Sequence, residues 1–538
     1  MGLPSIFARA PGRHSRVGLG RQAVTDSDEA FYAEAAREMF DGGDWLTPHF
    51  NYQERWEKPV LYYWLTAATY LPAGPSAWAA RWWSAMSGLG LVLLTWGMAR
   101  RMMARRDAAW LAAGVVATCF GYFAMARLAL PDLPLTFFVT LAIWSMLEGW
   151  WIVAGAAAGL GFLMKGPVAL VVPIIVLIPI WWRERRSLSI RSRDVVAAAL
   201  VFAAVGLPWY GAMTARHGVE YLQSFFVGDN LQRFATDRFN DPRPFWFYLP
   251  ILLGGMLPWT AYLVLVPWRS ATAVIRRRRH LLAGEWRLLI WVVAPLLFFT
   301  ISVGKQPRYI LPVLPPLAIL LAGSITRRLL EPAGTSRTSL TISTWITAAM
   351  YAALGVLLLR AQPLFLSVHP TMTYAAAVVL LASSLALVWL AISRRWRMFS
   401  AVTAACATLM LLSVQFGALA GLQPEPVEVM AASVRSHRTA NEPVGAYQVM
   451  VRNLIFYTRI EQVELFDEGR ALDFLKSPER VLLVVRELDL PRLEEISGVQ
   501  TKRLADVKYL DTANVRLRTL IAPMPAQDLE TVLLVSNK

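Results

Sequence analysis

Charged residues are scarce in this chain of 538 residues. Asp, Glu, Lys and Arg make up 17% of it, against about 25% in an average soluble domain. Hydrophobic residues make up 56%, and the mean hydropathy is +0.43. A soluble protein of this length would need enough polar side chains to cover several domains. The composition therefore excludes an ordinary soluble enzyme and indicates a protein that spans a lipid bilayer.

Cysteine and histidine are also rare. The two cysteines, Cys119 and Cys406, lie far apart in apolar runs, which excludes a disulfide framework and a cysteine-based metal site. The six histidines are scattered, so we expect no zinc site. Asp26-Ser27-Asp28 resembles the acidic pair that holds a metal ion in nucleotide-sugar enzymes, but no second acidic cluster supports it. We therefore expect no metal.

The net charge of +16 does not indicate a nucleic-acid partner, because the arginines lie between apolar runs, where they act as topology signals. Twelve of these runs are candidate spanning helices. They lie near residues 83–99, 108–126, 133–149, 152–164, 168–182, 195–214, 245–267, 288–303, 309–325, 340–360, 373–392 and 399–421. Lys165-Gly166-Pro167 separates two short runs, which predicts two short helices that meet at a turn; one long re-entrant element is the alternative.

Every second loop between these runs is rich in arginine, as the positive-inside rule requires of cytoplasmic loops. The basic loops contain Arg100, Arg101, Arg105 and Arg106; Arg183, Arg185, Arg186, Arg191 and Arg193; Arg276 to Arg279; Arg327 and Arg328; and Arg394, Arg395 and Arg397. The other loops and the chain after about residue 422 then lie on the outer side. Lys58, Lys165 and Lys305 are the only lysines before residue 424, and all fall on this outer side, as expected of an anion site.

The N-terminus does not fit this topology. Residues 1–24 contain Arg9, Arg13, Arg16 and Arg21 but no long apolar run and no signal-peptide core. Such a basic segment should stay in the cytoplasm, whereas the following segment must lie outside. We therefore expect that a first spanning helix is missing from this sequence and that the complete protein has thirteen.

Two regions are predicted to lie outside the bundle formed by residues 83–422. Within residues 25–82, the stretches 28–43 and 58–71 predict two amphipathic helices along the membrane surface. Residues 423–538 are richer in charge and predict a small α/β domain, without a nucleotide-binding glycine pattern. Its expected elements are a helix at 427–437 and strands at 444–450, 480–488 and 515–523. The fold class is thus an all-α polytopic membrane bundle with outer interfacial helices and a small C-terminal α/β domain.

Three acidic residues are candidates for catalysis. Asp28 and Glu29 open the first outer helix, and Asp132 lies at the outer end of a predicted span. Such positions also suit a helix cap or a first-turn acid that complements the helix dipole. Capping does not explain why the topology brings Asp28 and Asp132 to the same membrane face, where charged groups are functional candidates.

Basic residues and a phenol from the outer loops are candidates for binding a phosphate. They are Lys58, Arg233, Lys305, Arg308 and Tyr309, with Lys165 and Arg243 nearby in the same set of loops. A single basic residue at a membrane boundary is often only a snorkelling anchor. Together these residues predict an electropositive rim beside the carboxylates, suited to an anionic lipid headgroup such as a phosphate or pyrophosphate.

Six stretches of the sequence match motifs of a known family in the family's order. They are "TDSDEAFYAEAAREMFDGGDWLTPHF", "ERWEKPVLYYW", "ARLALPDLPLTFF", "GFLMKGPVAL", "QRFATDRFNDPRPFWFYLP" and "GKQPRYILPVLPPLAILLAG". The chain resembles the bacterial polyprenyl-phosphate-sugar glycosyltransferases of the protein O-mannosyltransferase superfamily (glycosyltransferase family 39-like), and within it the aminoarabinose lipid A transferase branch. The resemblance runs from about residue 24 to 330 and more loosely to the end.

The resemblance implies a type C glycosyltransferase fold of thirteen helices in a bacterial inner membrane, with a periplasmic active site. Asp28 matches the family's essential first-loop aspartate with Glu29 as its neighbour, and Asp132 matches its second aspartate. Lys58 matches the lysine that contacts the donor's phosphate. The segments that help to line that pocket contain Arg233, Lys305, Arg308 and Tyr309.

The implied reaction is inverting transfer of a sugar from a polyprenyl-phosphate donor, without a metal or nucleotide cofactor. Lys58, Arg233 and Lys305 or Arg308 would neutralise the leaving phosphate. Asp28 would orient the acceptor or act as its base. The first expectation is aminoarabinose transferred to lipid A; the alternative is mannose or another hexose transferred to a lipid, glycan or protein.

Two departures from the family pattern leave rival interpretations. The family's first helix is absent, and Asn230 stands where a histidine is frequent, which weakens any carry-over of a zinc site. A non-catalytic homologue, disabled by the missing helix, is one rival. A lipid-sugar flippase is another, but it predicts charged residues deep in the spans, and the mid-span positions are almost free of charge.

Overall fold

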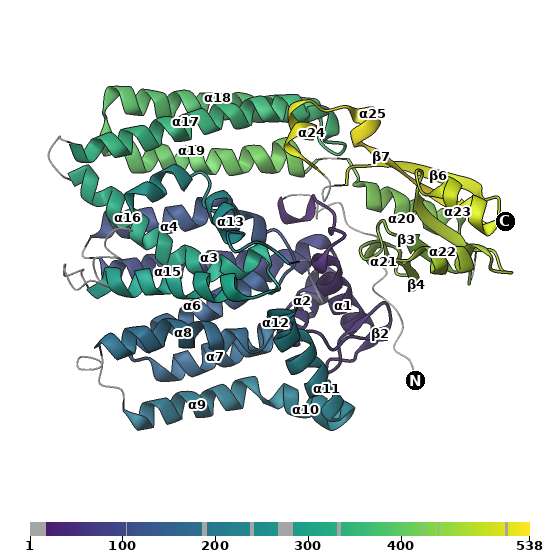
Figure 1. The fold of residues 1–538 in the computed structure, drawn as a ribbon, viewed down its shortest axis with the longest axis horizontal. Helices are drawn as coiled ribbons and strands as arrows, with labels where there is room; N and C mark the ends of the chain where they lie inside the picture. The colour runs from purple at the N-terminus through teal and green to yellow at the C-terminus, as the bar shows by residue number, and fades with distance from the viewer. Residues whose placement is uncertain are drawn as a thin grey trace.

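The structure is a computed structural model that describes residues 18–103, 105–184, 191–236, 242–266, 283–330, 335–421, 423–439, 441–511 and 515–538. Long helices stack side by side in one bundle, and the C-terminal domain lies at one end of it (Figure 1). The predicted N-terminal segment up to residue 17 and the basic stretches 185–186 and 276–279 lie outside the described residues.

The apolar runs form helices because lipid offers no hydrogen-bonding partner to the backbone. The bundle helices are α3 (Ala77–Met102), α4 (Arg106–Thr118), α5 (Phe120–Met125), α6 (Asp132–Glu148), α7 (Trp151–Lys165), α8 (Val168–Glu184), α9 (Ser192–Gly206), α10 (Pro208–His217), α13 (Tyr248–Gly255), α15 (Ala283–Ile301), α16 (Leu314–Leu330), α17 (Thr335–Ala361), α18 (Pro370–Ser393) and α19 (Phe399–Val414). Helix α7 ends at Lys165 and α8 begins at Val168, so the predicted turn between two short helices is confirmed.

Five helical segments of the described chain are each long and apolar enough to cross a membrane. They are Gly284–Ile301, Pro307–Leu330, Arg337–Leu364, Pro370–Ser393 and Trp396–Leu419. Helices α9 and α10, bent by 44°, make a sixth if they are counted as one span. The predicted runs at 108–126 and 245–267 are each broken into two helices, because Cys119 is extended and α13 ends before a 3-10 helix at Thr260–Leu265. The spanning bundle is thus confirmed, and the count of twelve stays a prediction.

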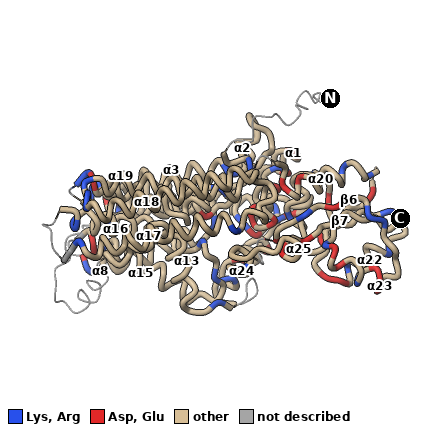
Figure 2. The backbone as a smooth tube through the Cα atoms, turned by 90° about the horizontal axis from the view of Figure 1, so that it is seen from above, with Lys and Arg blue, Asp and Glu red and all other residues tan. Residues whose placement is uncertain are grey.

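Charge is distributed unevenly along the bundle. Lys and Arg gather at the end far from the C-terminal domain, most of the bundle between the two ends carries few charges, and the C-terminal domain carries both signs (Figure 2). Arginine at one end of a bundle and not along its length is the pattern that the positive-inside rule produces. The distribution supports the predicted orientation, with the C-terminal domain on the outer side.

The outer segment before α3 contains α1 (Asp28–Gly42) and α2 (Leu61–Ala73), joined through the short strands β1 (His49–Phe50) and β2 (Gln53–Glu54). The Ser27 side chain caps α1, and Gly43 ends it in the left-handed conformation with φ 74°. Helix α1 is more enclosed than an amphipathic helix on a membrane surface, because its charged residues Glu34, Arg37 and Glu38 are buried as well.

The C-terminal domain has a five-stranded sheet in the order β4-β3-β5-β7-β6. The strands are β3 (Val444–Tyr447), β4 (Gln462–Leu465), β5 (Leu482–Arg486), β6 (Lys502–Tyr509) and β7 (Glu530–Ser536); β3 is parallel to β4 and β5, and β7 is antiparallel to β5 and β6. Helix α20 (Pro426–His437) packs on one face, and α22 (Glu468–Leu475) and α23 (Leu490–Ser497) pack on the other. The expected α/β domain is present.

One predicted strand of this domain is wrong. Residues 515–523 do not enter the sheet but contain the helix α24 (Leu517–Ile521), which packs against α17. The strands that complete the sheet, β4, β6 and β7, were not predicted. Strand preference reflects packing against neighbouring strands, and β6 reads as a charged segment because it forms one edge of the sheet with most of its side chains partly or fully exposed.

Candidate active site

A cavity of about 470 Å³ lies where α1, α6 and α8 meet two outer segments, 225–234 and 302–312. Its polar lining includes Asp28, Arg55, Glu57, Lys58, Asp132, Lys165, Asp229, Asn230, Arg233, Arg308 and Tyr309. Further along α6, α8 and α15 the lining is apolar, with Leu135, Val139, Val168, Val171, Val172, Phe298 and Phe299. The cavity therefore suits a ligand with a charged head and an apolar tail.

Two carboxylates and two cations alternate at the polar end of the cavity. The Lys165 ammonium group donates to Asp132 and lies 5.1 Å from the centre of the Tyr309 ring. The Arg308 guanidinium pairs with Asp132, at 3.3 Å between Nε and Oδ2, and also donates to Asp28. Asp28 and Asp132 open α1 and α6, so each lies in the first turn of its helix, where the dipole stabilises a negative charge.

Asp28 is held in its ionised form. Burial favours the neutral acid, but the paired Arg308 guanidinium outweighs burial, and Lys165 and Lys58 add to its effect, so the pKa of Asp28 is lowered. The carboxylate remains partly accessible, with 45% of its side chain exposed. It is therefore available to a molecule that enters the cavity.

Lys58 and Arg233 form the second group of charges in the cavity. The Lys58 ammonium group donates to the backbone oxygen of Glu57 at 3.0 Å, and Arg233 approaches Asp229 at 3.6 Å. Burial in the cavity and the neighbouring Arg233 charge lower the pKa of Lys58 to about 7. Burial raises the pKa of Asp229. Neighbouring charges thus only partly offset the cost of burying Lys58 and Asp229. An anion near Lys58 would favour the charged form of the lysine.

Asp229 and Arg233 lie on a helical segment with a π-helical centre. It consists of α11 (Val219–Leu222), a π-helix at Gln223–Leu231 and α12 (Gln232–Ala235). The backbone N–H of Val303 donates to the Phe234 oxygen at 2.9 Å and so joins this segment to the loop before α16. Only glycine fits at position 304, because a Cβ there would lie 2.1 Å from the Arg233 oxygen. This close approach fixes where Arg233 enters the cavity.

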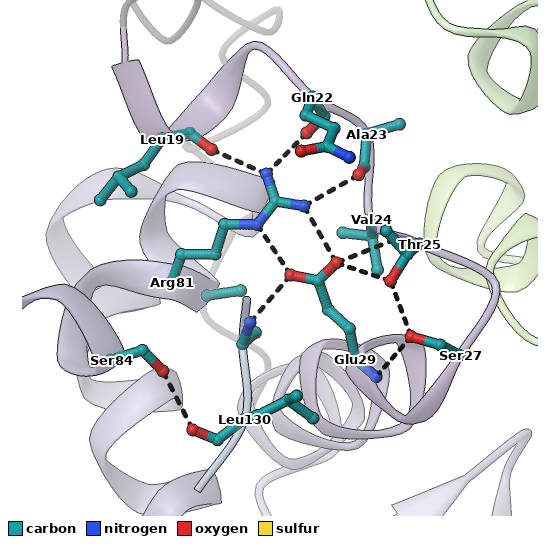
Figure 3. Close-up of polar contacts among 12 residues, drawn as sticks. Leu19, Gln22, Ala23, Val24, Thr25, Ser27, Glu29, Arg81, Ser84 and Leu130 are labelled. Atoms are coloured by element: carbon teal, nitrogen blue, oxygen red, sulfur yellow. Dashed lines mark hydrogen bonds and ion pairs between the residues drawn. The ribbon is translucent and has the colours of Figure 1, made fainter. Parts of the chain in front are cut away.

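Glu29 lies beside Asp28 but faces away from the cavity. Its carboxylate binds the Nε and Nη2 groups of the fully buried Arg81 at 2.7 and 3.0 Å. The remaining Arg81 donors bind the backbone oxygens of Leu19, Gln22 and Ala23 at 2.7 to 2.8 Å (Figure 3). Glu29 also accepts from the backbone of Ala129 at 2.8 Å, three residues before Asp132. One ion pair therefore joins the starts of α1, α3 and α6.

Six of the eight predicted site residues line this one cavity: Asp28, Asp132, Lys58, Arg233, Arg308 and Tyr309. The structure does not bring Glu29 or Lys305 to it. Lys305 is 7% exposed and donates to the Ser302 oxygen at 2.5 Å, so it fastens its own loop. Arg243 is exposed and also lies outside the lining.

Four charged lining residues were not among the predicted site residues: Arg55, Glu57, Lys165 and Asp229. Lys165 carried a signal, since it is one of the three early lysines on the outer side. Glu57 also carried one, because it precedes Lys58. Asp229 carried none, because an acid in a helical outer segment usually faces water. Within the described residues, no group of three His, Cys, Asp or Glu side chains is arranged to hold a metal ion.

The sequence is similar to known transferases. The sequence model of the dolichyl-phosphate-mannose-protein mannosyltransferase family matches residues 17–217. The undecaprenyl phosphate-alpha-4-amino-4-deoxy-L-arabinose arabinosyl transferase of Erwinia tasmaniensis is 32% identical over 487 residues, covering 85% of this chain and 84% of that protein. The transferase of the same name from Pseudomonas aeruginosa strain PAO1 is 35% identical over 339 residues, covering 60% of each chain.

Two solved structures share the fold. ArnT from Cupriavidus metallidurans, crystallised with undecaprenyl phosphate, superposes with a TM-score of 0.73 at 22% identity, over 97% of this chain and 96% of that one. The archaeal oligosaccharyltransferase AglB from Archaeoglobus fulgidus superposes with a TM-score of 0.52 at 13% identity, over 91% of this chain and 66% of that one. The likeness covers the bundle and the C-terminal domain together.

Proposed function

Because the chain belongs to the family of undecaprenyl phosphate-alpha-4-amino-4-deoxy-L-arabinose arabinosyl transferases, we propose that it moves this aminosugar from undecaprenyl phosphate to lipid A on the periplasmic side of a bacterial inner membrane. It is a glycosyltransferase. The observation that carries the proposal is the cavity, in which lysine, arginine and carboxylate side chains line one end and apolar side chains line the other. A polyprenyl-phosphate sugar has the same division into a charged head and an apolar tail.

In the proposed reaction, an acceptor oxygen attacks the anomeric carbon of the sugar. A bond forms between them, the bond from that carbon to the phosphate oxygen breaks, and undecaprenyl phosphate leaves from the opposite face with inversion. Lys58 and Arg233 neutralise the charge that develops on the leaving phosphate, and the Tyr309 hydroxyl donates to it. Both cations line the cavity, and Arg233 approaches Asp229 at 3.6 Å.

Asp28 and Asp132 have different tasks in this scheme. Asp28, partly exposed and ionised, orients the acceptor, or accepts its proton if the acceptor is a hydroxyl. If the acceptor is a phosphate of lipid A, it is already ionised and no base is needed. Asp132 holds Arg308 and Lys165 in place and is 3% exposed. Glu29 acts as a positioning residue through Arg81, and Lys305 positions the loop that carries Arg308.

The test is transfer by the full chain in vesicles that contain the aminoarabinose lipid donor and lipid A. Mass spectrometry should show lipid A that has gained one aminopentose. Asp28→Asn should slow transfer by about a hundredfold, because the acceptor is then oriented less well, while undecaprenyl phosphate still binds. Asp41→Asn is the matched control, because Asp41 lies on the same helix outside the cavity. Full activity of Asp28→Asn would refute the assignment, and an inactive wild type would favour a non-catalytic homologue.

A second donor is favoured by the match of residues 17–217 to a mannosyltransferase family. The same vesicles, supplied with polyprenyl-phosphate mannose in place of the aminosugar donor, separate the two candidates. A preference for mannose would replace the proposed donor sugar and leave the proposed cavity chemistry unchanged. Mass spectrometry of lipid A and of periplasmic glycoproteins from cells with and without the gene would identify the acceptor.

A further inference from the structure

Two arginines from different parts of the chain converge on one aromatic ring at the edge of the cavity. Phe31 lies one turn after Asp28 on α1 and lines the cavity. The Arg55 guanidinium carbon lies 3.9 Å from the centre of the Phe31 ring. The Arg452 guanidinium carbon lies 5.3 Å from the same centre. Arg55 belongs to the outer loop before α2, whereas Arg452 belongs to the C-terminal domain.

Both arginines have donor capacity that the described protein does not use. Their Nε atoms are buried and lack a hydrogen-bond partner. Arg55 pairs with Glu57, and no carboxylate of the described chain lies within ion-pair distance of the Arg452 side chain. Two further acids lie nearby: Asp26, whose carboxylate accepts from the Arg452 backbone N–H, and Glu464 on strand β4. Burial raises the pKa of the Glu464 carboxyl, so it offsets the two positive charges only in part. Two guanidinium groups beside the same ring, each with an unpaired Nε, are suited to a phosphate.

The position of the pair indicates which molecule would bring that phosphate. The donor's single phosphate is already assigned to Lys58 and Arg233, within the cavity. Arg452 does not line the cavity and comes from the domain beyond the membrane end of the bundle. The backbone N–H of Arg452 donates to the Asp26 carboxylate at 2.8 Å. Because Asp26 lies two residues before Asp28, this hydrogen bond keeps the turn that carries Arg452 close to the start of α1. A molecule that enters from the periplasmic side therefore meets Arg452 before it reaches Asp28.

We propose that Arg55 and Arg452 clamp a second phosphate of an anionic lipid acceptor, separate from the acceptor oxygen that reacts. The ligand class is a lipid with two phosphate groups. This proposal rests on the proposed function for its acceptor. The C-terminal domain is then part of the acceptor site. The enzyme would prefer acceptors whose two phosphates are spaced so that one reaches the arginines while the other reaches the cavity.

The experiment compares two acceptors, lipid A with two phosphates and lipid A with one, in the transfer assay with the full chain. For the wild type, the KM for the bisphosphate should be at least about tenfold lower, because the monophosphate lacks one charge-assisted contact. Arg452→Gln should raise the KM for the bisphosphate by about tenfold and leave kcat and the KM for the monophosphate unchanged. Arg470→Gln is the control, because Arg470 is an exposed residue of the same domain.

A purely structural role for Arg452 gives a different result. If the residue only fastens the C-terminal domain to Phe31, Arg452→Gln would impair transfer to both acceptors equally, and the proposal would be overturned. It would also be overturned if the wild type did not distinguish the two acceptors. Binding of bisphosphorylated lipid A without donor, measured by native mass spectrometry, separates the two proposals. Weaker binding by Arg452→Gln with no transfer by any variant would support the clamp and refute the proposed reaction.

Discussion

Lys58 is the cavity cation whose charge depends most on what occupies the cavity. Burial and Arg233 lower its pKa to about 7, so in the empty protein it is charged below this pH and increasingly neutral above it. A bound phosphate raises that pKa again, because it favours the charged form. Binding above pH 7 therefore requires proton uptake, and affinity should fall as the pH rises.

We expect the affinity for undecaprenyl phosphate to fall by up to about tenfold per pH unit between pH 7.5 and 9.5. In this range the phosphate itself no longer titrates, because its second pKa is about 6. Lys58→Arg keeps its charge throughout and should bind with a constant Kd. Isothermal titration calorimetry of both proteins at three pH values checks this. A wild-type Kd as flat as that of Lys58→Arg would show that Lys58 does not titrate.

The single residues of the site differ in how well the sequence could predict them. Asp28, Asp132 and Lys58 could be placed on one membrane face from the alternation of basic loops. The pairing of Arg308 with Asp28 and Asp132 could not, because it joins positions far apart in the sequence whose distance depends on how three helices pack. Whether Glu29 or its neighbour Asp28 faces the cavity depends on the rotation of α1 about its axis, which capping signals do not fix.

At the scale of elements, the Arg81–Glu29 ion pair determines how α1, α3 and α6 begin. All five Arg81 donors are used, and Glu29 is completely buried. Arg81→Met should lower the free energy of unfolding by about 3–5 kcal/mol, because it leaves a buried carboxylate without its cation. It should also lower kcat, since Asp28 and Asp132 lose their common support, while donor affinity stays near wild type.

Unfolding in denaturant and single-turnover kinetics measure these two effects. Adding Glu29→Gln to Arg81→Met should restore part of the stability, because the uncompensated charge is then removed. Arg127→Met is a suitable control: Arg127 lies in the loop before α6, is partly exposed and has no ion pair to a described carboxylate. Equal losses in Arg81→Met and Arg127→Met would argue against a specific role for the pair.

A second buried cluster lies further along α1. Burial and the neighbouring Glu34 raise the pKa of Glu38 to about 8, although Glu38 accepts from the Tyr52 backbone. A carboxyl whose folded pKa lies above its unfolded value of about 4.5 is destabilising once it must ionise. The contribution is absent at low pH and grows as the pH rises from about 4.5 to about 8. Glu38→Gln mimics the neutral form.

Glu38→Gln should therefore unfold at the same temperature as the wild type near pH 5 and at a higher temperature near pH 8. Differential scanning fluorimetry across this range checks the prediction. Glu428→Gln serves as the control, because Glu428 lies in the capping box of α20. A wild type that is more stable than Glu38→Gln at pH 8 would mean that Arg37 fully compensates the charge.

Elements were predicted well where one signal dominated. The apolar runs, the Gly43 stop of α1 and the helix α20 follow from hydropathy and capping alone. The strands β4, β6 and β7 did not, because their pairing depends on segments far away in the sequence. Strand β7 begins at Glu530, for example, and pairs with β5, which begins at Leu482. The breaks within the runs at 108–126 and 245–267 were also missed, since hydropathy reports where lipid is tolerated and not where a helix is continuous.

At the scale of the whole molecule, the segment 18–27 lies between the bundle and the C-terminal domain. Tyr457 accepts from the Val24 backbone at 2.7 Å, and Asn453 donates to the Val24 oxygen at 3.0 Å. The same segment binds Glu29 through Thr25 at 2.9 Å. The C-terminal domain is thus connected, through the backbone of this segment, to Glu29 beside the candidate residue Asp28.

Removing these contacts should weaken catalysis from a distance. Tyr457→Phe combined with Asn453→Ala leaves buried polar groups of Val24 unpaired, at about 1–3 kcal/mol each. We expect a lower melting temperature and a several-fold lower kcat, with an unchanged Kd for undecaprenyl phosphate. Tyr447→Phe, on β3 of the same domain, is the control. An unchanged kcat in the double variant would show that these contacts to Val24 do not support catalysis.

The alternation of Lys165, Asp132, Arg308 and Asp28 has a consequence for how variants of this site are interpreted. Each inner member neutralises two neighbours, so replacing one of them leaves unbalanced charge on both sides. The losses of activity from single substitutions will therefore not be additive. Their sum will exceed the loss caused by replacing all four residues together. Paired replacements that keep the four residues neutral in sum, such as Asp132→Asn with Lys165→Met, should lower the rate less than either change alone. The rate of a single variant therefore reports on the four residues together and not on one of them.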